Sequence, residues 1–194
     1  MGRETLELAQ RAWPDAQLDL YASRDQELEH GGTRFKVAAA ARLEEPSAAR
    51  GDLAFVALDD EHSRRFVPRL LELGYRVIDK SNTYRADPKV VLGVAGVNDE
   101  LLTNDVQLVA NPNCTTIPLM LALGPLLRRF GLSAVTVSTY QAVSGAGIGP
   151  LDQFLVDQQK GYAEPNRLGT QFNAAAYASN TVPHNGGTDD SGYS

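Results

Sequence analysis

Helices and strands alternate along the first hundred residues, as the spacing of apolar positions shows. Residues 3–13 and 61–73 carry apolar side chains on one helical face, and Gly74 follows the second where a helix commonly ends. The run 53–58 is apolar throughout, which is typical of a strand buried on both faces. Further short strands are predicted at residues 18–22, 34–38, 75–78 and 106–110. Strands separated by helices form βαβ units with a mostly parallel sheet, so we predict a doubly wound α/β domain.

The chain enters a helix at once, whereas a doubly wound nucleotide-binding domain opens with a strand and a glycine-rich turn. Gly2 stands where the last glycine of such a turn would stand, and the strand and the earlier glycines are absent. Two interpretations stay open at this point. The protein either starts with a helix or holds a domain of this class without its first strand.

The second part of the chain predicts only a few elements. Residues 115–130 are expected to form an apolar helix that Pro125 kinks. Residues 134–142 alternate like a strand and lead into a glycine-rich loop at 144–150, which lets the backbone approach a ligand closely. A helix is predicted at 151–160, and the pattern fades after it. One strand and two helices are too few to close a core, so we expect an incomplete second domain.

The composition is that of an ordinary globular protein and excludes several classes. With 43% hydrophobic and 22% charged residues, the chain can build a core. No run approaches the roughly 20 apolar residues of a membrane span, and no secretion leader opens the sequence. One cysteine excludes an internal disulfide, and with only three histidines it also excludes the usual zinc spacings. The net charge of −6 argues against a nucleic-acid binder. With these classes set aside, we expect a cytoplasmic protein.

The only cysteine, Cys114, lies between a predicted strand and a predicted helix, in the segment VANPNCTTIPL. Unpaired N–H groups and the positive end of the helix dipole at such a junction favour a thiolate, which is the nucleophilic form of cysteine. The carboxyl ends of strands are also where open α/β sheets bind ligands. An inert, buried cysteine is the alternative, although the neighbouring Asn and Thr side chains argue against a dry site.

Three segments resemble the aspartate-β-semialdehyde dehydrogenase family: NPNCTTIPL (111–119), STYQAVSGAG (138–147) and VIDKSNTYRADP (77–88). Their order and spacing agree with the family as well. The reductases of N-acetyl-γ-glutamyl phosphate are relatives, but the asparagine-rich turn before the cysteine favours the aspartate enzyme. The resemblance implies an incomplete Rossmann-like NADP-binding domain at 1–110 and the start of an α/β catalytic and dimerisation domain at 111–194. It also implies a homodimer or homotetramer at full length.

The reaction implied by the resemblance is the NADPH-dependent reductive dephosphorylation of L-4-aspartyl phosphate to aspartate semialdehyde, a step toward lysine, threonine and methionine. It requires a thiolate that forms a thioester, a hydride donor and an acid–base group. By resemblance, Cys114 is the nucleophile, and Asn113 and Gln141 position the substrate. Arg85 resembles the arginine that pairs with the substrate phosphate, a role that suits its bidentate fork.

Two segments are expected to contact the cofactor. Ser144 and Gly145 resemble the loop that lies against the nicotinamide. Ser23 and Arg24 follow the predicted strand at 18–22, where a carboxylate would favour NAD, whereas a hydroxyl and a guanidinium favour NADP. NADP is therefore the expected cofactor, and no metal site is expected.

The chain departs from the family pattern at both ends and in one loop. The opening strand and phosphate turn are missing, and the catalytic base is expected beyond Ser194, so we expect the chain alone to be nearly inactive. His184 is not assigned that role. Residues 57–60 replace the small, glycine-containing loop that the family has after this strand, and the charges of Asp59 and Asp60 would repel a phosphate. Three interpretations follow: a fragment of an ordinary enzyme, a non-catalytic homologue that binds a nucleotide or a partner, and a reductase of another acyl phosphate.

Overall fold

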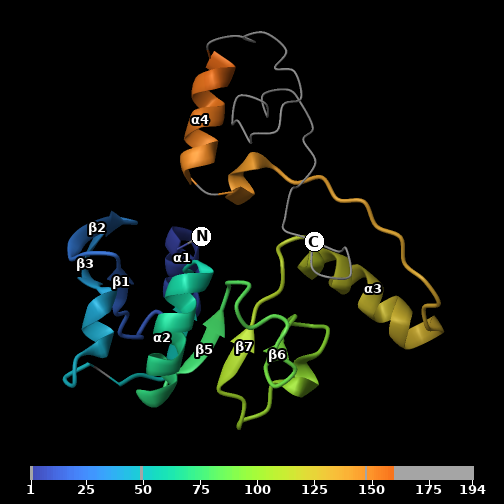
Figure 1. Ribbon diagram of the computed structural model, residues 1–194, viewed down its shortest axis with the longest axis horizontal. Coiled ribbons are helices and arrows are strands. Elements are labelled where there is room, and N and C mark those ends of the chain that lie inside the picture. Colours follow the sequence, from blue (N-terminus) through green and yellow to red (C-terminus); the bar gives the residue numbers. More distant parts are fainter. Residues whose placement is uncertain (1, 49, 147, 160–194) are drawn as a thin grey trace. The chain divides into compact units, whose positions relative to one another are not determined.

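The computed structural model describes residues 2–48, 50–146 and 148–159 (Figure 1). The chain divides into two compact units, Met1–Val135 and Thr136–Ser194. In its described part the second unit contains the short helix η3 (Val143–Ala146) and the helix α4 (Ile148–Gln159), which agrees with the helix predicted at 151–160. His184 lies outside the described residues.

The first sheet contains β1 (Leu20–Ala22), β2 (Gln26–His30) and β3 (Thr33–Ala39), in the order β1-β3-β2. β1 runs parallel to β3, and β2 and β3 form an antiparallel hairpin. Gly31 and Gly32 close this hairpin with φ angles of 56° and 75°, which a two-residue turn of this kind requires. β2 was not predicted, because its sequence QELEH is polar and shows no apolar run.

The second sheet contains four parallel strands in the order β4-β5-β7-β6 (Figure 1). Their bounds are Leu53–Val56 for β4, Arg76–Asp79 for β5, Val91–Leu92 for β6 and Leu108–Ala110 for β7. The predicted parallel sheet is confirmed, although β6 was missed. Because all four strands run the same way, their carboxyl ends share one edge of the sheet.

The prediction that residues 53–58 are buried on both faces is wrong. Leu53 and Phe55 keep 39% and 38% of their surface exposed, whereas Val56 keeps 4%. Successive side chains of a strand point to opposite faces, and α2 (Asp60–Glu72) packs against only one of them. On the other face the ring of Phe55 lies 6.2 Å from that of Trp13, between ring centroids.

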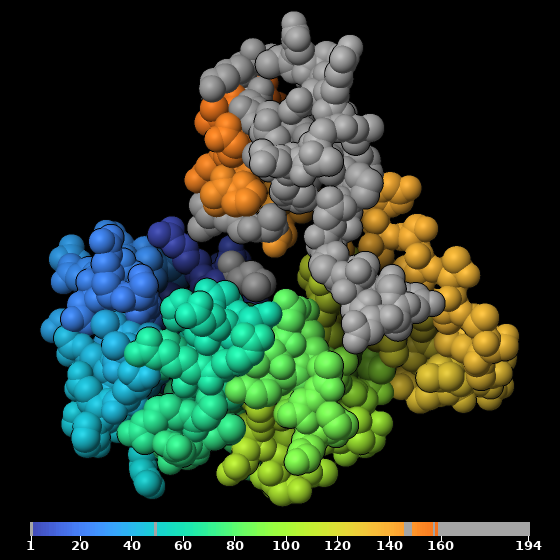
Figure 2. Space-filling view, in the orientation of Figure 1, coloured from blue at the N-terminus to red at the C-terminus, as the bar shows by residue number. Residues whose placement is uncertain are grey.

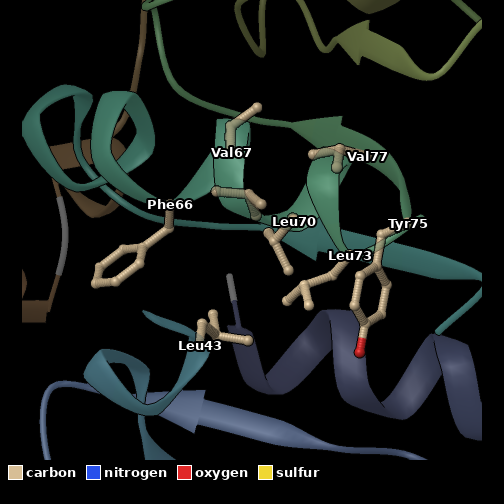
Figure 3. Packing of buried hydrophobic residues seen from close by; sticks show 8 residues of the cluster. Leu43, Phe66, Val67, Leu70, Leu73, Tyr75 and Val77 are labelled. Carbon is tan, nitrogen blue, oxygen red and sulfur yellow. The ribbon is translucent and has the colours of Figure 1, made fainter. Parts of the chain in front are cut away.

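The main core lies between α2, the second sheet and the short helix η1 (Ala40–Glu44), as Figure 3 shows. Phe66, Val67 and Leu70 of α2 are its central residues. Its other buried members are Leu43, Val56, Leu73, Tyr75 and Val77. The outer face of α2 stays at the surface, where Figure 2 shows its teal atoms between the blue atoms of the first sheet and the green atoms that follow β5.

The helix ends follow the local sequence. The helix α1 (Gly2–Ala12) buries Leu6 and Ala9, as its apolar spacing predicts. α2 is followed by Gly74 at a φ of 89°, which confirms the predicted end. The helix α3 (Thr116–Phe130) continues through Pro125 and is followed by Gly131 at a φ of 71°.

The strand predicted at residues 134–142 is wrong. These residues belong to no regular element, and all of them are exposed. A strand is stable only when a neighbour accepts and donates its ladder hydrogen bonds, and no strand in the described ranges pairs with this segment. A further short helix, η2 (Asp99–Leu101), lies between β6 and β7. Of the helices that the structure describes, none is both long enough and apolar enough to cross a membrane.

Candidate active site

Three loops meet at the carboxyl edge of the second sheet. Residues 57–59 follow β4, residues 80–85 follow β5 and residues 111–115 follow β7. β5 lies between β4 and β7 in the sheet, so its loop is next to the other two. This edge is where an open parallel sheet binds its ligands.

The turn after β7 places Cys114 at the surface. Its thiol donates to Oδ1 of Asn113 at 3.6 Å, and the same oxygen accepts from the N–H and the hydroxyl of Thr115 at 3.0 and 2.8 Å. The carbonyl of Asn113 accepts from the N–H of Thr116, the first residue of α3, at 3.0 Å. Cys114 is exposed. The predicted strand-to-helix junction is confirmed, and the alternative of a buried cysteine is wrong.

Arg85 connects the loops that follow β5 and β7. Its Nε donates to the carbonyl oxygen of Asn111 at 2.9 Å, and one terminal nitrogen donates to the carbonyl oxygen of Lys80 at 3.0 Å. The other terminal nitrogen donates to Oδ1 of Asn82. A guanidinium has five N–H donors. Three of them bind acceptors among the described residues, so two remain for a further acceptor.

Asp79, the last residue of β5, is fully buried and lies under this loop. Its carboxylate accepts from the hydroxyl of Ser63 at 2.7 Å, from the hydroxyl of Ser81 at 2.6 Å and from the N–H of Ser81 at 3.3 Å. Its carbonyl oxygen accepts from the N–H of Asn111 at 2.7 Å. One residue therefore fixes the beginning of both loops, and sequence reasoning missed it. The available signal was a run of polar residues at the end of a buried strand.

Lys80 joins the same edge to α1. Its ammonium donates to the hydroxyl of Thr5 at 2.6 Å, and its N–H donates to the carbonyl oxygen of Val56 at the end of β4. Partial burial lowers the pKa of Lys80, and the charge of Glu4 acts in the opposite direction. Lys80 was also missed, although it lies in the segment that carries the resemblance.

The two carboxylates expected to repel phosphate have structural partners. Asp59 caps α2, since its carboxylate accepts the N–H of His62 at 2.9 Å, and this bond together with the His62 ring lowers the pKa of Asp59. Asp60 accepts the N–H of Asn82 at 2.8 Å and so links α2 to the loop after β5. Their effect on a bound phosphate stays a prediction.

Ser23 and Arg24 are exposed at the carboxyl end of β1, as predicted. The carboxylate that follows them, Asp25, accepts the N–H of Ala39 and a guanidinium N–H of Arg42, both at 2.7 Å. The Arg42 guanidinium is the main cause of a lowered pKa of Asp25. The negative charge beside Ser23 and Arg24 is therefore paired.

Gln141, Ser144 and Gly145 belong to the second unit and are exposed. Ser144 and Gly145 lie in η3, where the N–H of Gly145 donates to the carbonyl oxygen of Ala142 at 3.1 Å. The first unit thus brings Arg85, Asn113 and Cys114 to one edge. Within the described ranges, no group of three His, Cys, Asp or Glu side chains could hold a metal ion.

Two family models match the chain. Residues 1–105 match the NAD-binding domain of semialdehyde dehydrogenases, and residues 123–194 match their dimerisation domain.

Several proteins with similar sequences or structures are named aspartate-semialdehyde dehydrogenase. An aspartate-semialdehyde dehydrogenase of Rickettsia conorii is 39% identical over 73% of this chain and 42% of its own length. One of Aquifex aeolicus is 35% identical over 95% of this chain and 55% of its own length. A crystal structure of aspartate semialdehyde dehydrogenase II from Vibrio cholerae has a TM-score of 0.82 at 30% identity, and the match covers 99% of this chain and 58% of that one. The chain thus spans about half the length of the relatives it matches.

Proposed function

This chain belongs to the semialdehyde dehydrogenase family, and we propose that it carries the nucleophile and the cofactor-binding region of an aspartate-semialdehyde dehydrogenase. The family and the α/β fold predicted from the sequence are thereby confirmed. The activity and the substrate are the proposal. They are supported by the names of the relatives and by a complex of the Vibrio cholerae enzyme with ASA, whose structure has a TM-score of 0.80.

One observation carries the proposal: the only cysteine is exposed at the edge where parallel strands end, directly before α3. In the proposed step the thiolate of Cys114 attacks the acyl carbon of L-4-aspartyl phosphate. The bond from that carbon to the phosphate oxygen breaks, and inorganic phosphate leaves with the electron pair. The product is an aspartyl thioester on Cys114. When bound, NADPH would supply the hydride that, with a proton, converts this thioester into the semialdehyde and the free thiol.

Arg85, Asn113 and Gln141 are the proposed substrate ligands. Arg85 keeps two N–H donors beyond its three bonds, and two donors suit a phosphate. The side-chain oxygen of Asn113 holds the cysteine turn, which leaves its NH₂ group for the acyl group of the substrate. Gln141 lies in the second unit and is assigned by the family resemblance alone.

The matching NAD-binding domain supports a nicotinamide cofactor, and we propose that it is NADP. Ser23 and Arg24 would bind the 2′-phosphate, since both are exposed after β1 and the adjacent carboxylate is paired with Arg42. Ser144 and Gly145 would lie against the nicotinamide.

The remaining parts of the proposal concern the whole protein. The matching dimerisation domain supports a homodimer or homotetramer. The junction predicted between residues 110 and 111 falls between the two family matches, which supports a cofactor domain before it and a catalytic domain after it. A cytoplasmic enzyme without nucleic-acid or membrane partners is part of the same proposal.

The thioester step can be tested on this chain without a cofactor. Because the catalytic base is expected beyond Ser194, we expect no turnover. Prolonged incubation with L-4-aspartyl phosphate should still add one aspartyl group slowly to Cys114, detected by intact-mass and peptide mass spectrometry, with release of one phosphate. Cys114→Ser is the matched control and should gain no thioester. The proposal would be wrong if iodoacetamide alkylates Cys114 readily while aspartyl phosphate leaves it unmodified.

A further inference from the structure

We infer that Arg85 is a positioning residue that sets the geometry of the cysteine turn before any substrate binds. This inference rests on the proposed function, in which Cys114 is the nucleophile. It differs from phosphate binding because it assigns the guanidinium a role in the free protein.

Asn111, the first residue of the turn, is fixed by hydrogen bonds at both of its backbone groups. Its N–H donates to the carbonyl oxygen of Asp79 at 2.7 Å, and its carbonyl oxygen accepts from Nε of Arg85 at 2.9 Å. The next residue, Pro112, is buried, and its ring fixes its own φ angle. Both backbone groups of Asn111 are therefore occupied, and the chain passes from there through a stiff residue to Asn113 and Cys114.

The guanidinium of Arg85 is itself fixed by the loop that follows β5. Two of its donors bind the loop after β5, through the carbonyl oxygen of Lys80 and Oδ1 of Asn82. That loop is in turn fixed by the buried carboxylate of Asp79 through Ser81. Arg85 thus links this hydrogen-bonded loop to the carbonyl group of Asn111.

The chemistry of the arginine side chain suits this link. A planar guanidinium can donate in three directions at once, as it does here, whereas a lysine ammonium is a single nitrogen on a flexible stem. Arg85→Lys therefore keeps the positive charge and loses the bridge. It separates an effect of geometry from an effect of charge.

The experiment measures the second-order rate constant for alkylation of Cys114 by iodoacetamide at pH 7, in phosphate-free buffer. We expect Arg85→Lys to lower it about fivefold, as the loss of one net hydrogen bond from the reactive geometry would do. The matched control is Arg128→Lys. Arg128 also donates to a backbone carbonyl, that of Val97 at 3.1 Å, but it touches no part of the turn. We expect its rate constant to equal that of the unsubstituted chain, since only distant contacts change.

Asn82→Ala is the second variant, and it decides the question if Arg85→Lys does not fold by far-UV circular dichroism. It removes one anchor of the guanidinium while Arg85 and its charge remain, and we expect about a twofold lower rate constant. The inference is overturned if the folded variants at both positions alkylate at the unsubstituted rate. The proposed function fails separately, when the unsubstituted chain forms no thioester with aspartyl phosphate.

Discussion

Removing the hydroxyl of Ser63 should destabilise the first unit by a predictable amount. Ser63 and Asp79 are both fully buried, and the hydroxyl donates to the carboxylate at 2.7 Å. A net hydrogen bond to a charged group is worth about 1.5–3 kcal/mol. Alanine recovers about 0.5 kcal/mol within α2, because it is the better helix former. We therefore expect Ser63→Ala to lower the free energy of unfolding by about 1–2.5 kcal/mol.

Urea denaturation followed by far-UV circular dichroism measures this loss as a lower midpoint at an unchanged slope. Ser133→Ala is the control, since Ser133 is exposed, and its effect should lie within about 0.5 kcal/mol of zero. The double variant with Asp79→Asn isolates the bond, because a neutral acceptor makes a weaker one. Ser63→Ala should then cost less in the chain that already carries Asp79→Asn. An equal cost with and without that second substitution would refute the assignment of the stabilisation to this hydrogen bond.

Two further predictions concern surface charge. Arg42→Ala should leave the charge of Asp25 unpaired beside Arg24. We expect the ratio of the affinity for adenosine 2′,5′-bisphosphate to that for 5′-AMP, measured by calorimetry, to fall by about threefold to tenfold. An unchanged ratio would contradict the proposed 2′-phosphate site. The pKa of Asp25 and of Glu44, lowered mainly by arginine hydrogen bonds, lie below the ordinary values of 3.8 and 4.5. The stabilisation that these two carboxylates contribute is complete above their ordinary pKa values and is lost as the pH falls through their pKa values in the folded protein. Glu44→Gln should therefore flatten the acid limb of a plot of stability against pH. An unaltered acid limb would contradict this contribution of Glu44.

The fold could be predicted where one local signal decided the structure. Helices α1 and α2 follow from apolar side chains on one face, and the parallel strands follow from short apolar runs. β2 could not be found in this way, because its stability comes from pairing with β3 and from the Gly31-Gly32 turn. Residues 134–142 show the reverse case. An alternating pattern favours a strand, but the strand forms only where a neighbouring strand completes the ladder.

In the candidate site, the position of the cysteine could be predicted from the sequence, and the residues that support its turn could not. Cys114 was found because a strand, a turn and a helix predict where the thiol lies, and the structure has it there. The supports of the turn depend on contacts between residues distant in sequence. Arg85 lies 26 positions from Asn111, and Ser63 lies 16 positions from Asp79. Neither spacing carries a signal in one sequence. The order of β5 and β7 in the sheet brings Arg85 close to Asn111, and the packing of α2 on β5 brings Ser63 close to Asp79. By family resemblance Arg85 is a ligand for phosphate, and its contacts also make it part of the scaffold that holds the turn of Cys114, the proposed nucleophile.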